Sequence, residues 1–229
     1  LRAHGVDNLN LYTHHVIQIA LVNAVKTVDQ LVETLGQLKY RQYKEALIAG
    51  YDSPGKRHSV SEIILTGDEL ARVLATCSYS QQEQLMDSIE EYRIPGMIQS
   101  VGQLTAILEV FQYRPNLQHS TFSDIAASRW ARRNSIIHSI ADRLPGWTED
   151  PEQFDNICEH LGPEQKKIVF ERVADRLPAI TQNVGDLGVI LRNLDTAQRQ
   201  TFLVQLGRDQ LARIMQQSPR CYLKDYRND

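Results

Sequence analysis

The sequence lacks the cysteine patterns of disulfide frameworks and metal sites. Its three cysteines, Cys77, Cys158 and Cys221, are widely separated, and neither a CxxC pair nor a histidine at zinc-ligand spacing accompanies them. Structural zinc sites and small disulfide-rich domains depend on such spacings. We therefore expect free thiols in a reducing compartment and no bound metal.

The chain also lacks a strong excess of charge and a long apolar run. Its 25 basic and 28 acidic residues give a net charge of −3, which favours neither nucleic acid nor anionic membrane as a partner. The most apolar stretch, from Val16 to Val25, contains Gln18 and Asn23 and has about half of the roughly 20 residues that span a membrane. We expect no nucleic-acid binding and no transmembrane segment. The start at Leu1, without a signal-peptide pattern, indicates a fragment of a longer protein.

The motifs of common catalytic sites are absent as well, since no HExxH, GxSxG or GxGxxG occurs. The nearest approach to a phosphate-binding loop is Gly50-Tyr-Asp-Ser-Pro-Gly-Lys56. In it Arg57 replaces the Ser or Thr that ligates Mg²⁺, and the residues before it indicate a helix, where the motif follows a strand. Ser53-Pro-Gly55 is instead typical of a turn. We expect no catalytic residue and no cofactor, although a site assembled from distant side chains stays open.

What the sequence does contain is a repeat. Ile140-Ala-Asp-Arg-Leu-Pro145 recurs as Val173-Ala-Asp-Arg-Leu-Pro178, and Ile94-Pro95 is a weaker copy. We interpret each of these proline pairs as the end of a helix, because the residue before proline disfavours helical dihedrals.

The same helix-start signature occurs in every copy. A Ser, Thr, Asp or Asn stands three residues before an acid or amide, so the first side chain caps the helix and the second reaches back to the cap. Apolar residues follow at helical spacing, starting one residue after each pair. The pairs are Thr27 with Gln30, Thr66 with Glu69, Ser100 with Gln103, Asp150 with Gln153 and Asn183 with Asp186.

A second helix follows after a short polar turn, opened by Gly162-Pro-Glu-Gln165 in one unit and Asp195-Thr-Ala-Gln198 in the next. The first-helix starts are 39, 34, 50 and 33 residues apart, so two units carry insertions, near 50–60 and 112–135. One hairpin of this size cannot bury its apolar stripe alone, whereas stacked neighbours can. The sequence therefore predicts an all-α fold of helical-hairpin repeats stacked as an α-solenoid or superhelical array.

We divide the chain into three parts. Residues 1–26 are predicted to be an N-terminal capping region with a helix over about Leu11 to Val25. Residues 27–217 are predicted to form about five hairpin units. Residues 218–229 are predicted to be a polar tail or the start of a further region.

Three stretches, Gly162-Pro-Glu-Gln165, Leu177-Pro-Ala-Ile180 and Asp186-Leu-Gly-Val-Ile-Leu191, resemble the Leu-Pro helical repeats of secreted effector proteins from Legionella-type intracellular bacteria. The likeness covers about residues 140–206 and, more weakly, 31–111. It implies a helical-repeat architecture and a bacterial origin with delivery to the host cytoplasm, and it carries over no catalytic residue.

Two basic clusters fall on the insertions, which the stacking of repeats does not require. The second lies in a helix expected to begin near Ser123, on which Trp130 aligns with Ile137 and Ala141 as a core face while the arginines point elsewhere. A solvated basic face and a partner-binding surface both fit this pattern. The candidate binding residues are Lys56, Arg57, His58, Arg129, Arg132 and Arg133.

We expect a non-catalytic protein-interaction module of a larger protein, with a protein partner that presents an acidic surface, such as a host protein. Peripheral contact with lipid phosphates is the weaker alternative. A helical enzyme domain with a site assembled across helices, and a structural spacer beside a catalytic domain outside this chain, stay open as other functions.

Overall fold

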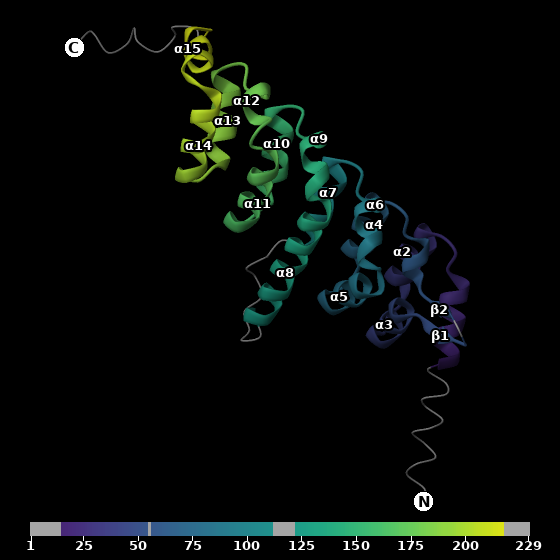
Figure 1. Ribbon diagram of the computed structural model, residues 1–229. Helices are drawn as coiled ribbons and strands as arrows, with labels where there is room; N and C mark the ends of the chain where they lie inside the picture. Colours follow the sequence, from purple (N-terminus) through teal and green to yellow (C-terminus); the bar gives the residue numbers. More distant parts are fainter. Residues whose placement is uncertain (1–14, 55, 112–121, 218–229) are drawn as a thin grey trace, which may run out of the picture. The chain divides into compact units, whose positions relative to one another are not determined.

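The computed structural model describes residues 15–54, 56–111 and 122–217 (Figure 1). Within these residues the chain is almost entirely helical, and its two strands form one short hairpin. The predicted all-α class is therefore confirmed. The chain divides into two compact units, residues up to 111 (unit 1) and residues from 112 on (unit 2).

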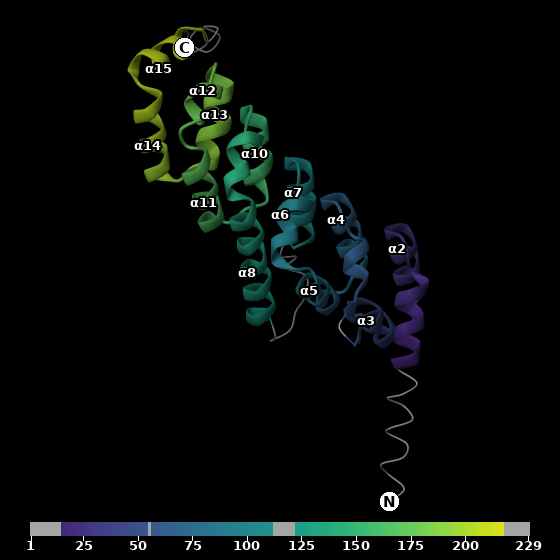
Figure 2. The same ribbon diagram turned by 45° about the vertical axis from the view of Figure 1, so that its right-hand side comes forward.

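Unit 1 is built from first and second helices in alternation. Residues 15–24 are helical, as expected for the described part of the N-terminal helix. The first helices lie side by side, α2 against α4 and α4 against α7, and the second helix α3 packs against α5 (Figures 1 and 2). The elements are α2 (Val28–Gln37), α3 (Arg41–Ala49), β1 (Tyr51–Ser53), β2 (Lys56–His58), η1 (Val60–Ile63), α4 (Gly67–Thr76), α5 (Tyr79–Ser88), η2 (Glu91–Arg93), α6 (Ile94–Met97) and α7 (Val101–Val110).

Unit 2 repeats the same order. The first helix α10 packs against the next first helix, α13, and the second helix α11 packs against α8 (Figure 2). The elements are α8 (Phe122–Ile140), η3 (Ala141–Arg143), α9 (Leu144–Trp147), α10 (Pro151–Glu159), α11 (Pro163–Val173), α12 (Leu177–Ile180), α13 (Val184–Asn193), α14 (Thr196–Leu206) and α15 (Arg208–Gln217).

All five predicted first-helix caps are present. In each, the cap oxygen accepts a hydrogen bond from the N–H three residues on, at 2.8 to 3.3 Å. The later side chain of each pair accepts from a backbone N–H at the cap or just before it. The apolar residue after each pair is buried, so cap and anchor together fix where each first helix starts and which face it buries. The anchors are Leu31, Leu70, Leu104, Phe154 and Leu187.

Removing a cap should have a modest and specific cost. Asp150→Ala leaves the N–H of Gln153 without its acceptor, which lies at 2.8 Å, and should lower the free energy of unfolding by about 1 kcal/mol. Urea denaturation followed by circular dichroism measures it. Asp150→Asn keeps an acceptor and should stay close to the parent, so equal losses in both variants would contradict the capping role.

The expectation that Leu-Pro pairs end the second helices is wrong. Leu144 precedes Pro145 yet has φ −52° and ψ −41°, which are helical dihedrals. The proline occupies the first turn of a short third helix, where its missing N–H has no intrahelical partner to lose. Leu144 is fully buried, and Thr148 closes the helix by donating its hydroxyl to the Leu144 carbonyl at 2.9 Å. The helices α6 and α12 follow the same pattern, so a short third helix precedes α7, α10 and α13, whereas the β-hairpin and η1 precede α4.

Second helices share a buried glutamine in their first turn. Its Oε1 accepts the backbone N–H of the residue that precedes the helix, at 2.8, 3.1 and 2.9 Å in α5, α11 and α14. The polar side chain thereby sets the start of the helix while being enclosed by the core. The three glutamines are Gln81, Gln165 and Gln198.

The first insertion forms a β-hairpin where the sequence indicated only a turn. Strand β1 pairs antiparallel with β2, with Tyr51 opposite His58 and Ser53 opposite Lys56. Gly50 enters the hairpin with φ 69°, and a Cβ at this position would lie 2.1 Å from the His58 carbonyl oxygen. The hairpin therefore depends on glycine at position 50.

Candidate functional site

The predicted basic cluster at the first insertion lies on strand β2. Alternate residues of a strand face opposite sides, so Lys56 and His58 share a side that Arg57 does not. The His58 ring stacks on Tyr51, with centroids 4.6 Å apart, and its Nε2 lies 3.0 Å from Ser53 Oγ. Arg57 donates to the Ala49 carbonyl at 3.3 Å. His58 thus holds the hairpin together, and the three side chains do not converge on one point.

The second predicted cluster lies on α8, and its orientation differs from the expected one. Trp130, assigned to the core face, has half of its surface exposed (50%). Arg133, assigned to the solvated face, is partly buried. The buried positions of α8 lie in its last two turns, where it packs as other second helices do, whereas its 19 residues exceed the 11 of α11 and α14. Trp130 lies before these buried positions along α8. The buried residues are Ile136, Ile137 and Ile140.

The guanidinium of Arg133 is in an unfavourable environment. Burial lowers its pKa, although arginine still carries its charge at neutral pH. Within the described part of the chain, Nε and Nη2 of Arg133 are enclosed and have no hydrogen-bond partner. Enclosing cationic donors without an acceptor costs free energy. A negative charge placed beside the guanidinium would offset part of that cost through its charge, without reaching the two enclosed nitrogens.

A groove of about 360 Å³ lies between α8 and α11, close to Arg133. Trp130 is on its wall, and Arg133 follows Trp130 by three residues, so the two are neighbours on the helix surface. Sequence reasoning found the arginines and missed the groove, because α11 belongs to the helical hairpin that follows α8 in the chain. The sequence signal that was available is the spacing of three residues between Trp130 and Arg133, which places an aromatic ring and a cation side by side on a helix. The groove is lined by Trp130, Asn134, His138, Glu164, Lys167, Ile168 and Glu171.

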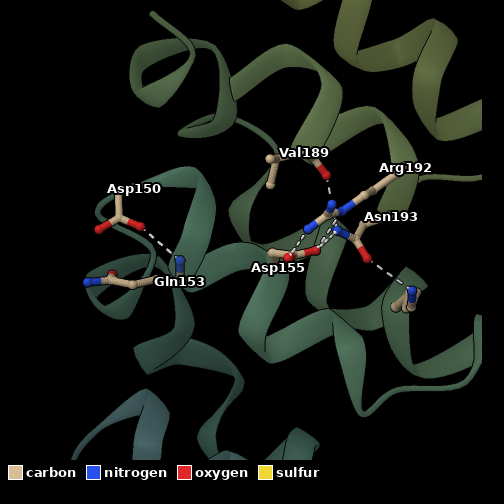
Figure 3. Close-up of polar contacts among 7 residues, drawn as sticks. Asp150, Gln153, Asp155, Val189, Arg192 and Asn193 are labelled. Atoms are coloured by element: carbon tan, nitrogen blue, oxygen red, sulfur yellow. Dashed lines mark hydrogen bonds and ion pairs between the residues drawn. The ribbon is translucent and has the colours of Figure 1, made fainter. Parts of the chain in front are cut away.

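Another polar cluster joins α10 to α13 and serves their packing (Figure 3). Asp155 accepts from Arg192 Nε at 3.0 Å and from Asn193 Nδ2 at 2.7 Å, and Lys166 Nζ donates to Asn193 Oδ1 at 3.1 Å. Burial alone would raise the pKa of Asp155. Hydrogen bonds from Arg192 and Asn193, with the charges of Arg192 and Lys166, outweigh burial and lower it.

The lowered pKa of Asp155 predicts a pH effect on stability. The carboxylate contributes stability above its unfolded pKa of about 3.9, and this contribution disappears as pH falls through the lower folded pKa. Asp155→Asn should therefore be destabilised near neutrality, with the difference from the parent shrinking in acid. Denaturation curves across that range measure it. As a control, Asp142→Asn removes an exposed ion pair with Arg172 and should change the free energy of unfolding little. A stability difference between Asp155→Asn and the parent that does not depend on pH would contradict the role of Asp155.

Two of the predicted free thiols are confirmed, and Cys221 lies outside the described residues. Cys77 and Cys158 are free and buried. Burial raises the pKa of Cys77 to about 11, against lowering by Thr76 and Lys44, and that of Cys158 to about 12. Both are protonated at neutral pH, so we expect alkylation at pH 8 to be far slower in the folded chain than in urea. Mass spectrometry measures the labelling of Cys77 and Cys158. If each is labelled at the same rate in the folded chain as in urea, the burial of these thiols is contradicted.

Comparison with protein-family models, with curated proteins and with solved structures gives no match. Among the described residues, no three His, Cys, Asp or Glu side chains gather as metal ligands. The same residues include no helix long and apolar enough to cross a membrane. Function therefore has to be inferred from the side chains of this chain.

Proposed function

We propose that this chain is an α-solenoid module that binds a protein partner with an acidic surface, and that the exposed face around Trp130 and Arg133 on α8 makes the contact. The observation that carries the proposal is the enclosed guanidinium of Arg133 without an acceptor, next to a half-exposed tryptophan. Tryptophan and arginine are the residues most enriched at the energetic centres of protein interfaces.

The repeated packing supports the solenoid part of the proposal. In each unit, first helices with the same cap and the same buried anchor pack against one another. Neighbours stacked in this way bury a continuous core and leave extended surfaces open, which repeat proteins use for binding. The long α8 stands out from this regular pattern, because it has 19 residues where the second helices α11 and α14 have 11.

The charge of α8 indicates the kind of partner. The helix carries three arginines and a histidine against one acid, Asp124. An acidic segment is therefore electrostatically complementary to it. The wall formed by α11 contributes Glu164 and Glu171 as well as Lys167, which favours a segment with a buried apolar or basic residue between its acids. The resemblance to effector repeats makes a host protein the proposed source.

The test uses the purified chain as bait in host-cell lysate, followed by affinity measurement with the captured and identified protein. Arg129→Ala/Arg132→Ala/Arg133→Ala and Trp130→Ala should each weaken binding by about 30-fold or more, the size of an interface hot spot. Thermal melts confirm that the variants fold.

The matched control removes three exposed cationic side chains elsewhere, as Lys26→Ala/Arg208→Ala/Arg213→Ala, and should bind within about twofold of the parent. Capture of no protein would favour the structural spacer. Equal loss in the control would show nonspecific charge attraction, and undiminished binding by the α8 variants would remove α8 from the interface.

A further inference from the structure

A cavity of about 640 Å³ lies in unit 1, where α3 meets the turn between α4 and α5. It is unrelated to α8 and to the insertions. Three of its lining side chains are cationic, four carry hydroxyls, and none is a carboxylate. The lining residues are Lys39, Arg41, Lys44, Thr76, Cys77, Ser78, Tyr79, Ser80 and Gln81.

The cations are held at the cavity in different ways. Arg41 Nη2 donates to Ser80 Oγ at 3.0 Å, while its Nε pairs with Glu45 at 2.5 Å, so the guanidinium is fixed beside the start of α5. Lys44 is half-buried, and its charge acts on the Cys77 thiol. Within the described residues neither Lys39 nor Lys44 has an ion-pair partner. Two of the three positive charges are therefore not neutralised by the protein.

Gln81 supplies an independent sign of a ligand. Only 3% of the residue is exposed, its Oε1 accepts the Ser78 N–H at 2.8 Å, and its Nε2 has no hydrogen-bond partner within the described residues. At the equivalent position of α11, the Nε2 of Gln165 donates to Asn134 Oδ1 at 2.8 Å. In unit 1 the cavity takes the place of that acceptor. Unlike Gln198 Nε2, the Gln81 Nε2 is not among the fully enclosed donors of the described residues, so it opens to solvent on the cavity side, where an oxygen atom of a ligand would take the place of water.

The third glutamine of this kind shows why the cavity in unit 1 is different. Gln198 Nε2 is also without a partner within the described chain, and it borders a cavity of about 290 Å³. That cavity has one cation, Lys166, which Asn193 already engages, and it includes the acid Asp195. Of these two cavities, the one beside Gln81 combines an amide donor without a protein partner with several cations and no acid.

We propose that the cavity beside Gln81 binds the phosphate group of a small phosphomonoester or of free phosphate. A phosphate dianion offers several acceptor oxygens for the cations, the hydroxyls and the Gln81 amide. The N-terminus of α5 adds a favourable dipole. A volume of about 640 Å³ exceeds what phosphate needs and leaves space for an attached group of sugar size. The Cys77 thiol is protonated at neutral pH and therefore contributes no nucleophile to the cavity.

Isothermal titration of the full chain with inorganic phosphate, glucose 6-phosphate and glucose tests the proposal at low salt. We expect dissociation constants between about 10 µM and 1 mM for the first two ligands, since small ligands gain limited energy per atom. Glucose should not bind. Tighter binding of glucose 6-phosphate than of phosphate identifies a phosphomonoester site, and equal affinities identify a site for phosphate alone.

Two variants and a control identify the cavity as the site. Lys44→Gln should weaken binding at least about fivefold, and Gln81→Glu, which keeps the Oε1 acceptor but replaces the donor by a charge of the wrong sign, at least about tenfold. Lys26→Gln removes an exposed charge of the same unit and should bind within about twofold of the parent. The affinity for glucose 6-phosphate should fall between pH 7.5 and 5.5, because the phosphomonoester dianion gains a proton near pH 6.

The proposal is overturned if neither phosphate nor glucose 6-phosphate binds the parent chain up to about 10 mM. It is also overturned if Lys44→Gln and Gln81→Glu bind like the parent while melting at the same temperature. Because the ligands are defined small molecules and α8 is unchanged, these outcomes are independent of the proposed protein partner.

Discussion

Gly50→Ala is expected to lower the free energy of unfolding of unit 1 by about 2–4 kcal/mol. A residue with a Cβ rarely adopts φ 69°, and the added atom would lie 2.1 Å from the His58 carbonyl oxygen and 3.0 Å from Ser59 Cα. Both contacts are with backbone, so no side chain can move aside to relieve them. The chain must shift β2 away from β1 or give up the bend at Gly50.

Gly36→Ala is the matched control for this substitution. Gly36 lies inside α2, and a Cβ there would meet no atom within 4 Å. Alanine in a helix interior is favoured over glycine, so this variant should gain about 0.5–1 kcal/mol. Urea denaturation compares the two, and nuclear Overhauser contacts between Tyr51 and His58 report on the hairpin. A Gly50→Ala protein with parental stability and an intact hairpin would show that the bend tolerates a side chain.

Phe154→Ala is expected to cost about 3–5 kcal/mol in unit 2. Phe154 is the anchor that follows the Asp150 cap, it is fully enclosed, and it is among the largest fully buried side chains of the described structure. Its removal leaves a cavity between α10 and its neighbours that a helix fixed by a cap cannot close by shifting. The loss therefore combines the transfer free energy of the ring with the cost of the cavity.

Glu152→Ala tests the same helix without touching the core. Glu152 is exposed in the first turn of α10, so its loss should cost no more than about 0.5 kcal/mol. The equivalent anchor Leu187 retains 7% exposure, and Leu187→Ala should fall below Phe154→Ala. Chemical denaturation of the three variants gives this order. If Phe154→Ala lowers the free energy of unfolding by only about 1 kcal/mol or less, burial at the anchor positions is not a main source of stability.

The features that sequence reasoning predicted are those decided by a few neighbouring residues. A cap such as Asn183 and its partner Asp186 stand three residues apart, and the bond between them forms in any helix that starts there. The anchors follow from the same local count, since Leu187 comes one residue after Asp186. Because each unit repeats these short-range decisions, the starts of α2, α4, α7, α10 and α13 could be placed from the sequence.

The features that it missed depend on contacts between residues far apart in the chain. The helical dihedrals of Leu144 before Pro145 are favoured by full burial of the leucine, which outweighs the local preference. The strands at residues 51–58 are too short for periodicity to indicate. The exposure of Trp130 follows from the length of α8 beyond its packed turns.

The proposed phosphate cavity also depends on contacts between residues far apart in the chain, which the sequence does not show. Lys39 and Lys44 are ordinary surface residues in the sequence, and Gln81 is one glutamine among many. They become a site because α3 packs against α5. The difference between Gln81 and Gln165 is visible only in their surroundings, since both accept the same backbone bond.

Both insertions lie outside the capped first helices. The hairpin of residues 51–58 follows the end of α3, and the added turns of α8 precede its packed part. Neither interrupts a capped first helix or displaces a buried anchor. A change of length at either place therefore leaves the caps and the anchors of the first helices where they are. The residues that fix the core and the residues that differ from one hairpin to the next are thus encoded by separate stretches of the chain.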